Sequence, residues 1–228
     1  MNPYLLAATA ALVAGTALAS APEVTAPNIS MINGAVDVTA GQPYGEVSTI
    51  NGAIHIEDRA VVGRVHTVNG GMTLGAEASA QSLRTINGAI SVRSGAHVTG
   101  TVNTVNGRIA LEPAAEVSGH LSNINGQIHL EAAHVGGGIE TVSGNIDIGS
   151  RSRVEGGVWV RKDCSTGFWA WLFAGHCEPS NVVVGPDAIV QGTLRFEHEV
   201  KLYVSTRARI GPVEGAKPIV YSGEHPPG

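Results

Sequence analysis

The stretch Ile50-Asn51-Gly52-Ala53-Ile54-His55-Ile56 decides the fold, because it returns almost unchanged at residues 86–92. Its Asn-Gly pair occurs six times along the chain in one register, and a Ser-Gly pair takes the seventh place. The pairs begin at Asn33, Asn51, Asn69, Asn87, Asn106, Asn125 and Ser143, so successive spacings are 18, 18, 18, 19, 19 and 18. A period of this length indicates one structural unit that repeats and stacks.

A second period of about six residues lies inside each unit. Large apolar residues recur at that interval, as at Ile50, Ile56 and Val62, and pairs such as Ile90 and Val92 have the spacing of one side of a strand. These periods predict an all-β fold: a single-stranded parallel β-helix (solenoid) with about 18 residues per coil, three inward-pointing positions per coil and a triangular cross-section. A series of β-hairpins is the alternative, since Asn-Gly also favours hairpin turns, but it does not account for the constant period.

The Asn-Gly pairs are predicted to form one corner of each coil, because both residue types tolerate a positive φ. Asparagines in the same position of successive coils can also hydrogen-bond to one another and so form an amide ladder. We therefore interpret the asparagines as structural residues. The predicted ladder consists of Asn33, Asn51, Asn69, Asn87, Asn106 and Asn125.

The composition divides the chain into six parts. They are a signal peptide (1–19), an N-terminal linker (20–30), β-helix repeats (31–162), a cysteine-bounded aromatic loop (163–180), C-terminal coils (181–216) and a tail (217–228). The apolar run Leu5–Leu18 is shorter than the roughly 20 residues that span a membrane, and Ala17-Leu18-Ala19 offers a cleavage site before Ser20. Because Met1–Tyr4 contains no basic residue, an uncleaved membrane anchor is the alternative to export.

The loop contains the two cysteines of the chain, Cys164 and Cys177, which would form a disulfide in an exported protein. Three roles are open for it: capping the helix, contacting another subunit, or resting on a membrane surface. Its possible contact residues are Phe168, Trp169, Trp171, Leu172 and Phe173.

Charge and motifs argue against several classes of function. The net charge is −5, and no Lys or Arg precedes Arg59, so nucleic acid is not an expected partner. The nine histidines are scattered over different coils, which predicts no metal site, and no catalytic or cofactor-binding motif is present. We expect no enzyme activity and no cofactor, with a polysaccharide-active enzyme or an acyltransferase as remote alternatives.

Phrases such as Ser94-Gly95-Ala96-His97-Val98-Thr99-Gly100 and Ala188-Ile189-Val190-Gln191-Gly192 resemble the repeats of bactofilins, the polymer-forming cytoskeletal proteins of bacteria. The resemblance covers most of residues 34–211. It implies a right-handed helix, filament assembly without nucleotide and a scaffolding role. The signal peptide and the cysteine-bounded loop depart from the bactofilin pattern, and adhesin-like repeat proteins are an alternative kinship.

The fold itself suggests how such a protein could act. The end coils of a β-helix expose unpaired backbone, so the ends must be capped or must polymerise. We therefore expect an exported scaffolding protein of the periplasm or cell envelope that self-associates end to end. The alternative is a binding module that contacts an envelope protein, a glycan or a membrane surface through a helix face or the aromatic loop.

Overall fold

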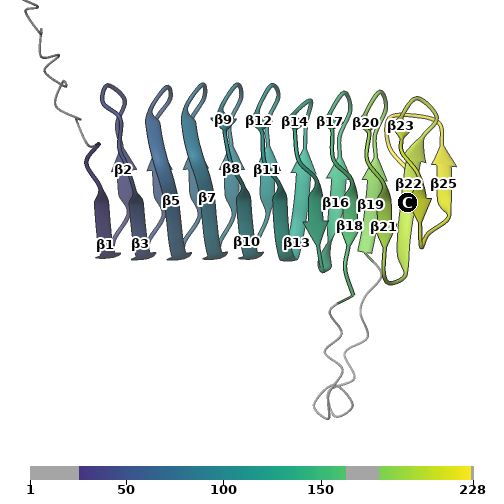
Figure 1. Cartoon of the computed structure of the whole chain (residues 1–228), viewed down its shortest axis with the longest axis horizontal. Coiled ribbons are helices and arrows are strands. Elements are labelled where there is room, and N and C mark those ends of the chain that lie inside the picture. Colours follow the sequence, from purple (N-terminus) through teal and green to yellow (C-terminus); the bar gives the residue numbers. More distant parts are fainter. Residues whose placement is uncertain (1–25, 163–179, 227–228) are drawn as a thin grey trace, which may run out of the picture.

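The computed structural model describes residues 26–162 and 180–226, which form strands and turns without any helix. The strands wind into about ten stacked coils, so the predicted parallel β-solenoid is confirmed (Figure 1). Each strand pairs in parallel with the strand one coil away, typically 18 or 19 residues along the chain. The stack forms a rod with β1 at one end and β25 at the other.

The strands fall into three columns, which we call faces A, B and C. Face A consists of β1 (Ile29–Asn33), β3 (Val47–Asn51), the second halves of β5 (Val61–Asn69) and β7 (Ser79–Asn87), β10 (Val102–Asn106), the first half of β13 (Leu121–Leu130), β15 (Ile139–Thr141), β18 (Val158–Val160), β21 (Leu194–Phe196) and β24 (Val213–Glu214).

Faces B and C complete each coil. Face B consists of β2 (Val36–Val38), β4 (Ile54–Ile56), β6 (Met72–Leu74), β8 (Ile90–Val92), β11 (Ile109–Leu111), the second half of β13, β16 (Ser143–Ile148), β19 (Ser180–Val184), β22 (Val200–Ser205) and β25 (Pro218–Tyr221). Face C consists of the first halves of β5 and β7, then β9 (His97–Val98), β12 (Glu116–Val117), β14 (His134–Val135), β17 (Arg153–Val154), β20 (Ile189–Val190) and β23 (Arg209–Ile210).

The core contains two inward-facing side chains per face, and therefore six per coil. In the second coil the inward-facing residues are Val47, Thr49, Ile54, Ile56, Ala60 and Val62, all of them buried. The predicted three inward positions are right for the Ile56 and Val62 columns but wrong for the column that contains Ile50. Ile50 is 46% exposed, because the strand alternation that buries Val47 and Thr49 turns Ile50 outward.

A polar residue takes the inward place beside Ile50 because the corner needs a donor there. Four buried threonines each donate from Oγ1 to the carbonyl oxygen of a corner glycine in the preceding coil. The pairs are Thr49–Gly34, Thr67–Gly52, Thr85–Gly70 and Thr104–Gly88, at 3.3, 3.1, 3.0 and 3.2 Å. In the next coil Asn123 takes the place of these threonines. Its side chain is 2% exposed, and its Oδ1 accepts a hydrogen bond from Thr141, whereas its Nδ2 has no partner.

The corner glycines are required by close stacking, and this corrects the explanation from positive φ. A Cβ on Gly52, Gly70 or Gly88 would lie 1.9–2.0 Å from the carbonyl oxygen of the glycine one coil earlier. None of these three glycines has a positive φ. At the Asn-Gly corner only Gly34 and Gly126 of the described glycines have a positive φ, of 115° and 137°. Positive φ is more frequent at the corner between faces B and C, where it occurs at Arg59, Glu77, Gly95, Ala114, Ala132, Arg151 and Asp187.

The structure also shifts the predicted boundaries. β1 begins at Ile29, inside the predicted linker, and Ser180, placed in the predicted loop, is the first residue of β19. The predicted tail contains β25, which pairs with β22 and extends the helix by part of a coil. The gap in the described residues, 163–179, falls between β18 on face A and β19 on face B, where the other coils carry the Asn-Gly corner.

We expect Gly88→Ala to destabilise the protein more than Gly95→Ala. The first change drives a Cβ into a main-chain oxygen of the preceding coil, which we expect to cost about 3 kcal/mol, as severe overpacking does. The second places alanine at φ 68° with its nearest neighbour 3.6 Å away, at a cost of about 1 kcal/mol. Denaturant unfolding followed by circular dichroism measures both, and an equal loss for the two variants would refute the stacking explanation.

Candidate functional site

The six predicted ladder asparagines lie one above another at the corner between faces A and B. Each Nδ2 donates to the Oδ1 of the asparagine one coil earlier, from Asn51 to Asn33 through Asn125 to Asn106, at 2.9–3.1 Å. All six side chains are exposed. The ladder is uncharged and its amides are occupied with one another, so it is a structural element with no chemistry of its own.

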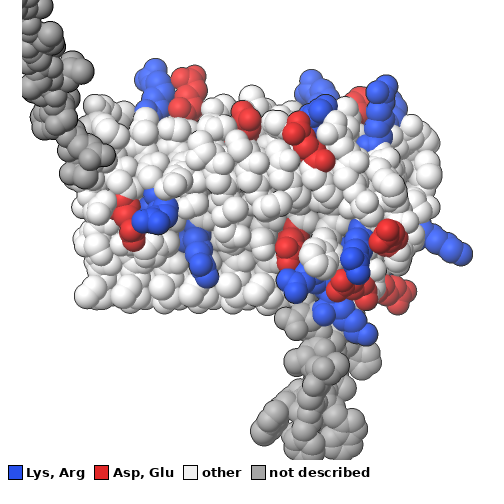
Figure 2. All heavy atoms as spheres, in the orientation of Figure 1, with Lys and Arg blue, Asp and Glu red and all other residues white. Residues whose placement is uncertain are grey.

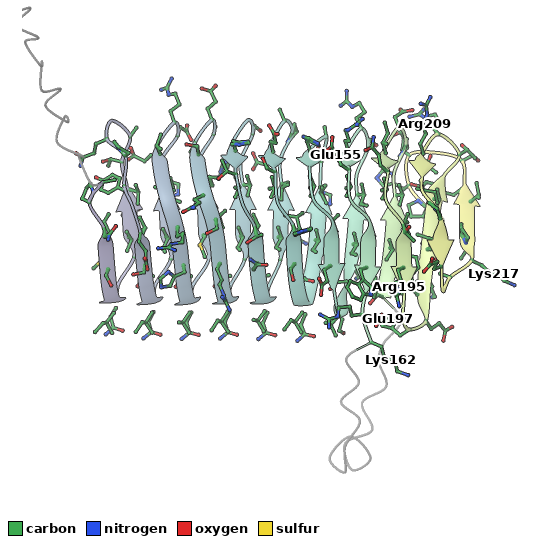
Figure 3. The ribbon with its side chains drawn as sticks, in the orientation of Figure 1. Glu155, Lys162, Arg195, Glu197, Arg209 and Lys217 are labelled. Carbon is green, nitrogen blue, oxygen red and sulfur yellow. The ribbon has the colours of Figure 1, made fainter. Side chains whose placement is uncertain are left out.

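The predicted disulfide and contact residues lie outside the described residues. These are Cys164, Cys177, Phe168, Trp169, Trp171, Leu172 and Phe173. The structure does place the residues on either side of them: Val160 and Lys162 before the gap, and Ser180 after it. Lys162 and Glu197 lie close together at the lower edge of the rod in Figure 3.

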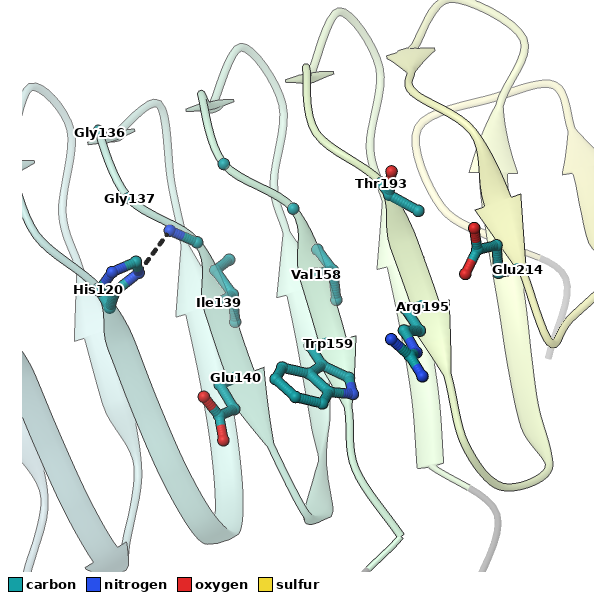
Figure 4. A pocket seen from close by; sticks show the side chains of 13 residues that line it. His120, Gly136, Gly137, Ile139, Glu140, Val158, Trp159, Thr193, Arg195 and Glu214 are labelled. Atoms are coloured by element: carbon teal, nitrogen blue, oxygen red, sulfur yellow. Dashed lines mark hydrogen bonds between the residues drawn. The ribbon is translucent and has the colours of Figure 1, made fainter.

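A cluster that the sequence analysis missed surrounds Trp159 on face A. Glu140, Trp159 and Arg195 occupy the same outward position in three successive coils. The indole is 38% exposed, and the guanidinium carbons of Arg161 and Arg195 lie 5.1 and 5.6 Å from its ring centroid. Figure 4 shows the ring between Glu140 and Arg195. Continuing the repeat register from β18 across residues 163–179 to β21 would have revealed this alignment.

Hydrogen bonds fix the cluster in place. Trp159 Nε1 donates to Glu197 Oε1 at 3.1 Å, the Lys162 backbone N–H donates to Glu197 Oε2 at 3.1 Å, and Arg161 pairs with Glu140 at 2.8 Å. The Lys162 hydrogen bond lowers the pKa of Glu197 most, with Trp159, Arg195 and Arg161 adding to it and burial acting in the opposite direction. A carboxylate held ionised in this way suits binding better than proton donation.

The cluster borders an open groove of about 790 Å³ (Figure 4). Its floor consists largely of glycines at the corner between faces C and A, among them Gly137 and Gly157, so main chain is accessible there. His120 lines one side, and its Nδ1 accepts from the Gly138 N–H at 3.0 Å. An exposed aromatic ring beside charged groups and bare backbone can bind a flat polar ligand.

The groove arises where one extra residue lengthens the corner between faces C and A. At the C–A corner, the inward residues Ala80 and Leu83 are three positions apart, whereas the corresponding Val98 and Val102 of the next coil are four apart. The longer corner persists in the following coils, where glycine occupies it. The change from a spacing of 18 to a spacing of 19 between Asn87 and Asn106 is therefore the sequence signal of a wider corner.

Several histidines lie beside carboxylates, and one of them, His134, lies between Glu116 and Glu155 at 3.6 and 3.3 Å. His129 Nδ1 lies 2.9 Å from Asp147 Oδ2, and His97 Nδ1 lies 3.4 Å from Glu116 Oε2. Within residues 26–162 and 180–226, no three His, Cys, Asp or Glu side chains are grouped so as to hold a metal ion. The described part of the chain also contains no long apolar helix of the kind that crosses a bilayer.

The two ends of the described rod present unpaired strand edges. At one end β1 pairs only with β3, and β2 only with β4; at the other, β23, β24 and β25 each have one neighbour. Inward-facing side chains become accessible there, with Met31 41% and Val220 64% exposed. Both ends therefore combine free hydrogen-bonding groups with an apolar centre.

Comparison with known proteins adds no further assignment. No family model matches the chain, and neither the curated proteins nor the solved structures contain a significant match. What the geometry defines is a β-solenoid, a fold compatible with a structural or a binding role.

Proposed function

We propose that this chain is a non-enzymatic scaffolding protein of the bacterial cell envelope that assembles end to end. The observation that carries the proposal is the pair of open ends, where strand edges and inward-facing apolar residues are both accessible. Such edges recruit another strand unless something covers them. A second copy of the same solenoid is the partner with a matching cross-section.

Head-to-tail stacking would continue the repeat without a change of architecture. The last strand of each face, β24, β25 and β23, would lie against the first coil of the next copy, with β24 on β1 and β25 on β2. Parallel pairing would then run on across the junction as it does between coils. Because this contact joins two different surfaces and does not close, it generates a filament. The resemblance of the repeat phrases to those of bactofilins supports the same outcome.

Export is supported by the N-terminal sequence. The apolar run Leu5–Leu18 and the small residues Ala17 and Ala19 fit a cleaved signal, and an oxidising compartment would allow Cys164 and Cys177 to form a disulfide. We expect mature protein from the periplasmic or envelope fraction to begin at Ser20, as N-terminal sequencing can determine. A chain that retains Met1, in the cytoplasm or in the membrane, would contradict this part of the proposal.

We expect Val220→Asp to shorten or abolish filaments, because it places a carboxylate on a surface that stacking would bury. Ile219→Asp is the matched control, since Ile219 lies in the same strand but faces outward beside Tyr203. Electron microscopy and sedimentation velocity measure the assemblies. Wild-type protein that stays a monomeric rod at high concentration would overturn the proposal, as would a Val220→Asp variant that assembles normally.

A second candidate function, glycan binding, is favoured by the Trp159 groove. Sugar rings stack on exposed aromatic faces. Their hydroxyls can donate hydrogen bonds to a carboxylate such as that of Glu140 and accept them from a guanidinium such as that of Arg195. The groove is open and lies along the rod, which suits a linear polysaccharide of the envelope. A binding role of this kind is compatible with a scaffold.

We expect Trp159→Ala to weaken binding of an oligomer of N-acetylglucosamine by about tenfold, the loss of one stacking contact, whereas Trp159→Phe retains most of it. Tyr203→Ala, which removes a half-buried aromatic residue from face B, is the control. Isothermal titration calorimetry gives the affinities. No binding by the wild-type protein, or equal affinities for the Trp159 and Tyr203 variants, would remove the groove from consideration.

A further inference from the structure

An unbroken row of β-branched apolar side chains lies on the outside of face A, one per coil through seven coils. We call this row the apolar stripe: Ile32, Ile50, Val68, Ile86, Val105, Ile124 and Val142. Ile32, Ile50, Ile86 and Ile124 are 67%, 46%, 39% and 41% exposed, and the three valines are half-buried. The stripe occupies the outward position immediately before the Asn-Gly corner in every coil that has one.

The composition of the stripe contrasts with the other outward column of the same face. Two positions earlier in each coil the outward residues are polar: Ser30, Ser48, His66, Arg84, Asn103, Ser122 and Glu140. Isolated exposed apolar residues are ordinary, but a continuous row of them marks a contact surface. The polar column on one side and the asparagine ladder on the other give the stripe the polar borders of an interface.

The surface around the stripe carries little charge. Among the outward positions of face A from β1 to the first half of β13, Arg84 is the one Lys, Arg, Asp or Glu residue. The lower edge of the rod below these strands is correspondingly white in Figure 2, whereas charged side chains gather near the same edge in the C-terminal half of the rod. A copy of the same surface would meet only two charged side chains beside the seven stripe residues, Arg84 and Glu140, and both lie in the polar border and not in the stripe.

We propose that the apolar stripe packs side by side against the stripe of a second copy of this chain. The stripe presents one side chain per coil, at intervals of about 4.8 Å, and another solenoid has the same interval on a flat face. Two copies related by a twofold axis would run antiparallel and interdigitate their isoleucines and valines as in a dry sheet–sheet interface. This pairing is independent of end-to-end assembly, since it uses a side of the rod.

The size of the surface sets the expected strength. The stripe and its borders cover roughly 30 Å by 15 Å, on the order of 450 Å² per copy, which is at the low end for specific protein interfaces. A single rod should therefore pair weakly and reversibly. Filaments would pair more firmly, because each added rod adds another stripe along the same line. A membrane surface is a poorer fit, because the stripe contains no Trp, Tyr or Lys side chain of the kind that anchors at lipid headgroups.

The test separates lateral pairing from end-to-end growth by blocking the ends with Val220→Asp. In that background we expect sedimentation velocity of the full chain to show a monomer–dimer equilibrium. Changing Ile50, Ile86 and Ile124 together to Ser should shift this equilibrium at least tenfold toward monomer. Val61→Ser with Ile219→Ser is the control, because these residues are equally exposed and apolar but lie outside the stripe.

Cross-linking tests the geometry. Ile86 is the middle residue of the stripe, so in an antiparallel pair a photo-cross-linking side chain in its place should attach to the same region of the other copy. The same side chain in place of Ile32 should attach near Val142. Adducts that join like positions at both sites would overturn the antiparallel arrangement.

Three further results would refute the proposal. They are a strictly monomeric chain with blocked ends, equal dimerisation of the stripe and control variants, and binding of the stripe to anionic liposomes in place of a second copy. Dimerisation that appears only when residues 1–19 are deleted would assign the stripe to that segment instead. None of these outcomes depends on whether the wild-type protein forms filaments.

Discussion

The close approach of main chain to main chain at the A–B corner is the constraint on which the rest of the structure depends. From Gly52 to Gly144, each corner glycine lies against the carbonyl group of the glycine one coil earlier, with no room for a Cβ between them. That contact sets the coils at ordinary sheet spacing on the side where the chain turns most tightly. It also places the asparagine amides within hydrogen-bonding distance and gives the inward threonines their acceptors.

The same constraint explains why the stripe faces outward. The threonine before the corner must point inward to reach a glycine carbonyl, so the residue after it must point out. That residue could have been polar, as it is two positions earlier, yet it is Ile or Val in all seven coils. After β18 the sequence has no Asn-Gly pair, and Arg161 takes the position that Val142 occupies one coil earlier. The neutral and charged parts of face A thus meet at the coil where the corner changes.

Most of the fold could be predicted from the sequence, because in a solenoid the length of the sequence repeat equals the offset between paired residues of successive coils. The Asn-Gly spacing and the pairs such as Ile54 and Ile56 were sufficient for the coils, and the series Val184, Val190, Phe196 and Leu202 recovered the winding after the insertion. The Ile50 column was misassigned because a six-residue period does not say which face of a strand an isoleucine takes. Only the hydrogen bond of the buried threonine decides that.

The candidate sites were harder to predict for a different reason. The Trp159 cluster draws residues from strands separated by the insertion, so its members become neighbours only once the register across residues 163–179 is known. In the sequence, the glycines that form the floor of the groove look the same as the glycines at other turns of the repeat. Both are properties of how columns align between coils, which local patterns do not contain.

The first coils share one register of 18 residues, with the same contacts above and below each of them. Any one of these coils therefore already matches its neighbours on both sides, and a duplicate of it would find the same glycine, threonine and asparagine partners. The rod can lengthen or shorten by whole coils, in steps of about 4.8 Å, without altering its ends or the insertion. Its length is in this sense a separate, adjustable property of the chain, independent of the surfaces that the rod carries.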